Sequence, residues 1–567
     1  MGTGPPRLPE AATAVNVSAV ETYGRWAVPL DSLGLGPSVP PRRLPDQPQV
    51  SPIGSQISRA MLRAPAGPPA GSGHRTTGRI ASSVAPRLAP AGAMPSRAMP
   101  SASVLRSPDQ LDLELPLGLP ELPIPTDWKD QQRLWGHSLH PMCSYLASFP
   151  AALAHAFIAR WSRPGDVVLD PFSGRGTTPL QACAEGRVGV GNDLNPFAHL
   201  LTASKVDPAP PAAARTRLAA LRLGWARNGA GWTELAGRVQ AASADDPVEA
   251  HDARVPVAGS GAGPDARDEP VLAEVALAFH PRTLAQVLFI RSMLRLEEPV
   301  DRFLAAAVTG ILHGKSRSYL SEIMPNTFSM APRYVRDFAA RTGFQSPERD
   351  VFTCIDAKLD RLYREPPPTT RGIALLGDAR DFGARAKAAL GERSLPDRAR
   401  LVVTSPPYLR VVKYGYYNWL RTWFLGEDSR AIDAALDDAH HREPYLAFMR
   451  DVLAGLRQIL AEDAVVVLVV GDVELDRGRP IRGGFGLAER VWETAAEPEG
   501  YALAGLVVDP IASHRKMTKL WGDEAGRATK TDRILILGAS PTGRRRALAG
   551  AATPISWDWP PRGLRSL

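Results

Sequence analysis

The sequence predicts an α/β fold with a doubly wound, mostly parallel sheet. Short runs of valine, isoleucine and leucine alternate with helical patterns through much of the chain, which is typical of β-α-β units. Several of these runs end in an acidic residue or a polar turn, and one leads through a glycine-containing loop into a helix. Because ligands of such sheets bind at the carboxyl ends of the strands, these ends form the candidate functional site.

The composition is that of a soluble globular protein, with 567 residues, 44% hydrophobic and 22% charged. A formal net charge of +8 favours a polyanionic partner. The three cysteines, Cys143, Cys183 and Cys354, form no C-x-x-C pair, so the sequence predicts neither a disulfide framework nor a metal site. We expect a cytoplasmic protein without a membrane partner, because no apolar run is long enough for a span and no signal peptide is recognisable.

Composition also divides the chain. Residues 1–108 are rich in proline and alanine without an apolar period, so we expect them to be disordered. The domain with the predicted sheet is expected in two parts, 109–207 and 371–545, separated by a mainly helical insertion at 208–370 and followed by a tail at 546–567. Helical spacing of apolar residues is strongest between Val271 and Phe344, and a helix is also expected from Tyr445 to Leu460.

The first chemically informative stretch surrounds a glycine loop. A buried strand, Val167 to Leu169, ends in Asp170 and is followed by a G-x-G loop and a helix from about Thr177. Glycines at a strand-to-helix turn let a ligand approach the backbone, and the helix amino end offers free N–H groups. The next strand ends in Asp193, about twenty residues past the glycine loop, where an acid can hold ribose hydroxyls. The missing third glycine favours a smaller adenosyl ligand over a dinucleotide.

A second stretch is the elbow at Ser405-Pro406-Pro407-Tyr408, which follows a short apolar strand. The two prolines supply no N–H, so the elbow presents mainly acceptors, the Ser405 hydroxyl and nearby carbonyls. Such acceptors suit an exocyclic amine, and Tyr408 can stack on a flat ring. The alternative interpretation is a strand-ending turn with a surface tyrosine.

Basic residues interleaved with aromatics occur in the insertion and after the elbow. Side chains of these kinds contact phosphates and stack on bases, although solvated helix faces have the same composition. The candidate nucleic-acid-binding residues are Lys315, Arg317, Arg333, Arg336, Arg410, Lys413 and Lys516.

Together these stretches resemble the DNA amino-methyltransferases, which use S-adenosylmethionine to methylate cytosine N4 or adenine N6. The loop from Asp170 to Thr178 matches the family's D-P-F-x-G-x-G-T-T motif, and the elbow matches its (D/N/S)-P-P-(Y/F/W) motif. The resemblance implies a Rossmann-like class I methyltransferase fold and catalytic roles for Ser405, Pro406, Pro407 and Tyr408. It implies cofactor binding by His140, Pro141, Asp170, Pro171, Phe172, Gly174, Gly176, Thr177, Thr178, Asp193, Asn195 and Asp378.

The resemblance also implies the chemistry. An unstacked base would rest on Tyr408 while Ser405 and the Pro406 carbonyl accept its amino hydrogens, leaving the nitrogen lone pair free for direct displacement at the sulfonium methyl. No cysteine follows a proline, so cytosine C5 methylation is not expected. Serine at position 405 favours cytosine N4 over adenine N6. Unlike many relatives, this chain places the cofactor loop before the elbow.

Other functions share part of this pattern. An RNA base methyltransferase and a protein glutamine methyltransferase both use a P-P-Y elbow, and a non-catalytic binding protein can retain the fold. The D-P-F-x-G-x-G-T-T form favours DNA, and the intact motifs favour an enzyme. No nuclease motif is recognisable, which is compatible with a separately encoded restriction nuclease as partner.

Overall fold

The computed structural model describes residues 118–245, 254–265, 269–270, 272–407, 413–436, 442–471, 486–510 and 531–560. The disorder expected for residues 1–108 therefore concerns a segment outside the described residues. Three predicted site residues also lie outside them, namely Tyr408, Arg410 and Lys516.

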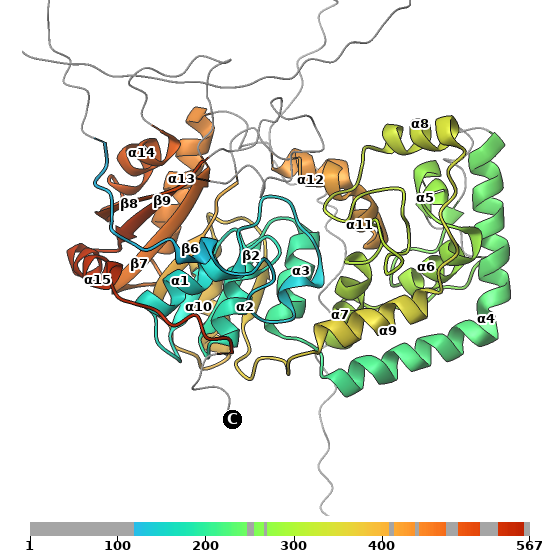
Figure 1. The fold of residues 1–567 in the computed structure, drawn as a ribbon, viewed down its shortest axis with the longest axis horizontal. Coiled ribbons are helices and arrows are strands. Elements are labelled where there is room, and N and C mark those ends of the chain that lie inside the picture. The colour runs from blue at the N-terminus through green and yellow to red at the C-terminus, as the bar shows by residue number, and fades with distance from the viewer. Residues whose placement is uncertain are drawn as a thin grey trace, which may run out of the picture. The chain divides into compact units, whose positions relative to one another are not determined.

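A seven-stranded sheet organises the amino- and carboxyl-terminal parts of the described chain (Figure 1). All neighbouring strands pair in parallel except at β9, which is antiparallel to both β7 and β8. The doubly wound, mostly parallel sheet predicted from the sequence is thus confirmed. In spatial order the strands are β5 (Ile373–Leu376), β2 (Val188–Asp193), β1 (Val167–Asp170), β6 (Ala399–Thr404), β7 (Leu460–Gly471), β9 (Thr531–Gly538) and β8 (Ala502–Pro510).

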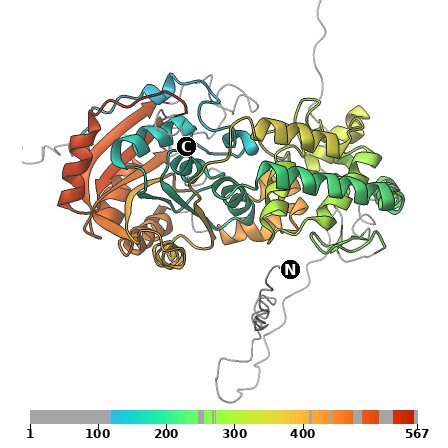
Figure 2. The same cartoon turned by 90° about the horizontal axis from the view of Figure 1, so that it is seen from below.

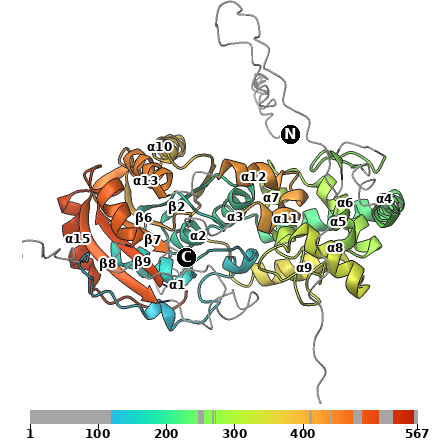
Figure 3. The same cartoon turned by 90° about the horizontal axis from the view of Figure 1, so that it is seen from above.

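Helices cover both faces of this sheet because the central strands are apolar on both sides. In β1, Val167 and Leu169 pack with one group of helices, and Val168 points to the other face. Figure 3 shows α10 and α13 on one side of the sheet and α1 on the other. The first group comprises α10 (Phe382–Glu392), α13 (Arg442–Leu456) and α14 (Leu487–Val491), and the second comprises α1 (Ala151–Trp161), α2 (Thr177–Ala184) and α15 (Pro541–Ala551).

The chain reverses its direction of travel across the sheet between β1 and β6. From β1 it continues through α2 to β2 and then through α3 (Pro196–Val206) toward β5, whereas from β6 it continues to β7 on the opposite side. At such a switch point the two neighbouring strand ends diverge and leave a crevice at their carboxyl ends. Asp170 and Ser405, the residues that end β1 and follow β6, both lie there.

The segment between β2 and β5 forms a second, helical core (Figure 2). A 35-residue helix, α4, packs along α6 and α7, and prolines occupy the first turn of several of these helices, as their missing N–H allows. Two short helices that follow the elbow, α11 (Trp419–Phe424) and α12 (Ser429–Ala435), lie next to one another, and the apolar residues of α11 join this core. The helices of the segment are α4 (Pro211–Asp245), α5 (Ala273–Ala278), α6 (Pro281–Met293), α7 (Pro299–Thr309), α8 (Pro332–Thr342) and α9 (Val351–Leu362), with a two-strand ribbon of β3 (Arg254–Val255) and β4 (Glu269–Pro270).

One predicted boundary was wrong. The helix expected to run to Leu460 ends at Leu456, and Leu460 already begins β7. The backbone N–H of Ala399 donates to Ile459 O at 2.8 Å, so pairing with β6 begins at this point. Apolar residues continue without a break across the junction, and periodicity alone therefore could not locate it.

Candidate active site

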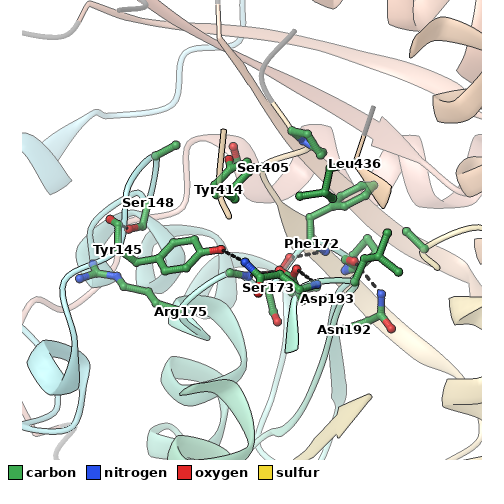
Figure 4. A pocket seen from close by; sticks show the side chains of 18 of the residues that line it. Tyr145, Ser148, Phe172, Ser173, Arg175, Asn192, Asp193, Ser405, Tyr414 and Leu436 are labelled. Atoms are coloured by element: carbon green, nitrogen blue, oxygen red, sulfur yellow. Dashed lines mark hydrogen bonds between the residues drawn. The ribbon is translucent and has the colours of Figure 1, made fainter. Parts of the chain in front are cut away.

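A pocket opens at the carboxyl ends of the four strands β1, β2, β5 and β6 (Figure 4). It holds about 1000 Å³ of empty space, its open mouth included. Acidic residues at the ends of three successive strands of the sheet contribute to it, and the elbow after β6 supplies the remaining edge. The lining residues used below are Tyr145, Asp170, Phe172, Asp193, Asp378, Ser405, Tyr414 and Phe448.

The glycine loop after β1 forms the floor of the pocket. Gly174 and Gly176 have positive φ values of 49° and 75°, which glycine adopts without steric strain. Gly176 caps the amino end of α2 in the left-handed conformation. The N–H of Gly174 donates to the Asp193 carboxylate at 2.8 Å, so the loop is fixed to the end of β2.

Replacing Gly176 with alanine should destabilise the protein by about 2–4 kcal/mol, because strain and a clash combine. The added Cβ would lie 2.8 Å from Thr202 Oγ1 and 2.9 Å from Thr202 Cα. Gly343 provides the control, since its φ is 61° but no atom lies within 4 Å of an added Cβ. Urea unfolding of both alanine variants measures the difference. Equal losses of stability would contradict the clash at Thr202.

Two carboxylates at the strand ends have raised pKa values, Asp170, which is buried, and Asp193, which is half-buried. Burial raises the pKa of Asp170 from 3.8 to about 7, although its Oδ1 accepts the Thr404 hydroxyl at 2.6 Å. Burial likewise raises the pKa of Asp193 to about 6, against hydrogen bonds from the N–H groups of Gly174 and Asn195. Among the residues that the structure describes, no cation lies within ion-pair distance of Asp193. Its side chain is partly exposed to the pocket, where it can accept hydrogen bonds from a ligand.

The raised pKa of Asp170 makes the stability of the ligand-free protein pH-dependent. The folded state holds the Asp170 proton more tightly than the unfolded chain, so this contribution is complete below the ordinary value of 3.8 and is lost as the pH rises through about 7. Asp170→Asn removes the charge and keeps an acceptor for Thr404. We therefore expect the variant to unfold at higher urea concentration than the wild type at about pH 8, and with little difference near pH 4. A constant difference between the two proteins across this range would contradict the shift.

The third acid, Asp378, follows β5 and behaves differently. Its carboxylate accepts three hydrogen bonds from the Arg380 guanidinium. Partial burial acts to raise its pKa, but the hydrogen bonds and charge of Arg380 outweigh burial and lower the pKa. Arg380 also stacks over Phe448, whose ring lies 5.8 Å from that of Phe172. This side of the pocket is a flat, largely apolar wall with one fixed carboxylate.

The elbow ends the buried strand β6. Thr404 is fully buried, whereas Ser405 and Pro407 are partly exposed and line the pocket. Pro406 is buried and does not line it. The Thr178 hydroxyl donates to Val403 O at 3.0 Å and thereby fixes the helix after the cofactor loop to the strand of the elbow.

The structure gathers most of the predicted cofactor-binding residues around the pocket but leaves others beneath it. Asp170, Pro171, Phe172, Gly174, Thr177, Asp193, Asn195 and Asp378 line it. His140 is buried with its Nε2 2.8 Å from Gln181 Oε1, and burial lowers its pKa well below the usual value. The Pro141 carbonyl accepts a hydrogen bond from Lys358. Neither these two residues nor Gly176 and Thr178 line the pocket.

The predicted nucleic-acid-binding residues that are described all lie on the surface. None of them lines the pocket. Two have carboxylate partners on helices, since Arg333 pairs with Asp337 and Arg336 with Glu274. Exposed side chains are those of Lys315, Arg317, Arg333, Arg336 and Lys413.

Sequence reasoning missed several aromatic residues of the pocket. Tyr145 and Tyr414 stack with ring centroids 5.8 Å apart and an interplanar angle of 19°. Tyr145 lies four residues after Pro141, and Tyr414 lies six residues beyond Tyr408, so both were near residues predicted to belong to the site. Tyr145 and Tyr414 both line the pocket and are labelled in Figure 4.

No helix in the described ranges is both long and apolar enough to cross a membrane. Within the same ranges, no group of three or more His, Cys, Asp or Glu side chains is arranged to hold a metal ion.

Segments of this chain are similar in sequence to known proteins. Residues 121–204, which carry the glycine loop, match the N6/N4 methyltransferase family described as DNA methylase. The chain is 36% identical over 70 residues to the type II methyltransferase M.MjaII of Methanocaldococcus jannaschii and 40% identical over 70 residues to M.SmaI of Serratia marcescens. Each match covers 12% of this chain, and they cover 13% and 24% of the relatives, so the shared segment is a small part of either protein.

Among solved structures, TrmN from Thermus thermophilus superposes over 70% of this chain and 52% of its own, with 12% identity and a TM-score of 0.24, a likeness too slight to bear on fold or substrate. The family match includes the glycine loop, in which the Gly174 N–H donates to the Asp193 carboxylate. On this ground residues 121–204 resemble the N6/N4 methyltransferase family, and the relatives matched by short segments of the chain are type II methyltransferases.

Proposed function

We propose that this protein is a DNA methyltransferase that transfers a methyl group from S-adenosylmethionine to the N4 amino group of cytosine. The single observation that carries the proposal is the shared pocket. Asp193, a partly exposed carboxylate with no cation partner among the described residues, and the acceptor elbow at Ser405 line one cavity at the switch point of the sheet. Serine rather than aspartate in the elbow supports cytosine N4 over adenine N6.

The residues present fit the cofactor. Asp193 has acceptor capacity left for two ribose hydroxyls, because its described hydrogen-bond partners are backbone N–H groups. Phe172 and Phe448 offer apolar surface to a purine ring. Gly174 has no side chain that would fill the floor of the pocket. When bound, S-adenosylmethionine supplies an electrophilic methyl group on a positively charged sulfur.

The elbow is proposed to orient the accepting nitrogen. An exocyclic amino group carries two hydrogens and a lone pair that its ring delocalises. The Ser405 hydroxyl and the Pro406 carbonyl accept the two hydrogens, so the lone pair is localised and held in one direction. Such a displacement depends on positioning more than on a strong base, and the described pocket accordingly needs no cysteine nucleophile. Tyr408 is proposed to stack on the base.

DNA is the proposed polymer because the matching family is described as DNA methylase. The base must leave the duplex to reach a pocket at the strand ends. We propose that residues 208–370 recognise the target and that Lys315, Arg317, Arg333, Arg336, Arg410, Lys413 and Lys516 contact phosphates. The structure describes five of these residues, and their basic side chains are exposed, which supports contact with phosphates.

The proposal is tested on DNA from cells that express the wild type or Ser405→Ala, digested to nucleosides and analysed by mass spectrometry. We expect N4-methylcytosine only with the wild type. N6-methyladenine instead would retain the mechanism and overturn the choice of base. Methylation of RNA alone would overturn the choice of polymer. A methylated protein without a modified nucleic acid would indicate a protein glutamine methyltransferase, and no methylated product would indicate a non-catalytic binding protein.

A further inference from the structure

A fully buried arginine lies behind the pocket wall. Arg421, in α11, is 1% exposed, and no carboxylate among the described residues lies within ion-pair distance of its guanidinium. Its Nε has no hydrogen-bond partner. A buried charge without a counter-ion is unfavourable unless several dipoles surround it, so its contacts are informative.

One contact leads from Arg421 to the pocket. Its Nη1 donates to Asn418 Oδ1 at 2.8 Å, and Asn418 Nδ2 donates to the Tyr414 carbonyl at 2.9 Å. The Tyr414 ring stacks on Tyr145, whose hydroxyl accepts a hydrogen bond from Asn195. This chain of contacts therefore joins α11 to the residue that caps the helix after β2.

A second set of contacts leads from the same arginine into the helical segment. Arg421 Nη2 donates to Asn326 O at 2.7 Å, and Nη1 also lies 3.5 Å from Thr327 O. Two more hydrogen bonds join this loop to the segment after the elbow at the amino end of α11. The N–H of Ser329 donates to Tyr417 O and the Trp419 indole donates to Met330 O, each at 2.6 Å.

We infer that Arg421 is a positioning residue of the transfer site, which holds Tyr414 against the pocket through Asn418 and ties it to the 326–330 loop of the helical segment. The 326–330 loop is part of the connection between α7 and α8, and the same connection carries the exposed Lys315 and Arg317, which are proposed to contact phosphates. DNA bound there is thus linked mechanically to the wall of the pocket. This inference rests on the proposed function where it concerns methyl transfer and DNA, whereas the link between the two segments does not depend on it.

The test compares Arg421→Met and Arg421→Lys with Arg546→Met. Arg546 is a suitable control because its guanidinium also donates to backbone carbonyls, those of Asp463 and Trp161, but it lies on α15 and does not line the pocket. We expect Arg421→Met to lower kcat by about a hundredfold, as a displacement of the wall by about 1 Å would. The affinity for S-adenosylmethionine should stay near the wild-type value, Arg421→Lys should recover part of kcat, and Arg546→Met should keep the wild-type kcat.

Asn418→Asp keeps an acceptor for Arg421 but removes the donor to Tyr414, and so tests the link without removing the buried charge. It should lower kcat about tenfold, in line with the loss of one hydrogen bond. A wild-type kcat in Asn418→Asp, or in folded Arg421→Met, would overturn the inference. The inference would also be overturned if kcat and the fraction of protein that binds the cofactor fell in the same proportion, because that result indicates a loss of folded protein.

Hydrogen exchange separates this inference from the proposed function. In Arg421→Met, amides of 326–330 and 414–418 should exchange faster together, whereas in Arg546→Met both should keep wild-type protection. If the wild type methylates no nucleic acid but the two segments still open together, the proposed function fails and the positioning role stands. If only one segment responds, the positioning role fails whatever the activity.

Discussion

Ser405→Ala is expected to lower kcat for methyl transfer by about 10²–10³-fold, comparable with the loss of one precisely placed polar group in other active sites. The variant loses the hydroxyl that is proposed to accept an amino hydrogen, while the backbone of the elbow is unchanged. Ser405 is partly exposed at the end of β6 and has no described role in packing, so the fold should be unaffected. Steady-state methylation of a DNA substrate and the affinity for S-adenosylmethionine are the two measurements.

Ser405→Asn is the matched control, because it restores a side-chain oxygen that accepts hydrogen bonds. The related elbow motif also accommodates asparagine. We expect Ser405→Asn to retain much more activity than Ser405→Ala, and both variants to bind the cofactor as the wild type does. Equal activity of Ser405→Ala and the wild type would show that the hydroxyl takes no part in orienting the base.

Asp193→Ala is expected to weaken S-adenosylmethionine binding by at least about a hundredfold. Hydrogen bonds to a charged partner contribute roughly 1.5–3 kcal/mol each, and the carboxylate is proposed to accept two from the ribose. The variant also releases the N–H groups of Gly174 and Asn195, so the glycine loop loses its connection to β2. Calorimetric titration with the cofactor measures the effect.

Asp207→Ala controls for the loss of an acid at the same helix. Asp207 follows the carboxyl end of α3, whereas Asp193 precedes its amino end, and Asp207 does not line the pocket. The affinity of the Asp207→Ala variant for the cofactor should equal that of the wild type. Because the pKa of Asp193 is raised to about 6 by burial, wild-type affinity should also fall as the pH drops through that value. Wild-type affinity in Asp193→Ala would refute the assigned role.

The fold class could be predicted from the sequence because the two features that determine it, the buried strands and the turns that follow them, depend on residues close together in the chain. Valine-rich runs such as Val167–Leu169 predict buried strands, and the glycines after Asp170 predict the turn into α2. The placement of Asp170, Asp193 and Ser405 in one pocket followed from a general property of parallel sheets, in which the carboxyl ends of strands share one edge.

The residues that pack around the pocket were not predictable in this way. The segment from Tyr414 to Phe424 is rich in aromatic and basic residues, which on a surface would favour nucleic acid. In the structure Trp419 and Arg421 are buried against the helical segment. His140, which was predicted to bind the cofactor, is likewise buried and does not line the pocket. Whether such residues are buried or exposed depends on contacts between residues distant in sequence, and composition alone does not distinguish a buried position from a surface position.

Transfer of an isotope-labelled methyl group by the purified protein tests the central claim most directly. The protein would be incubated with S-adenosylmethionine labelled in the methyl group and with DNA, and the digested nucleosides analysed by mass spectrometry. We predict labelled N4-methylcytosine with the wild type and its near-complete loss in both Asp193→Ala and Ser405→Ala. Label on no exocyclic amino group of DNA, although the wild type binds the cofactor, would contradict the account.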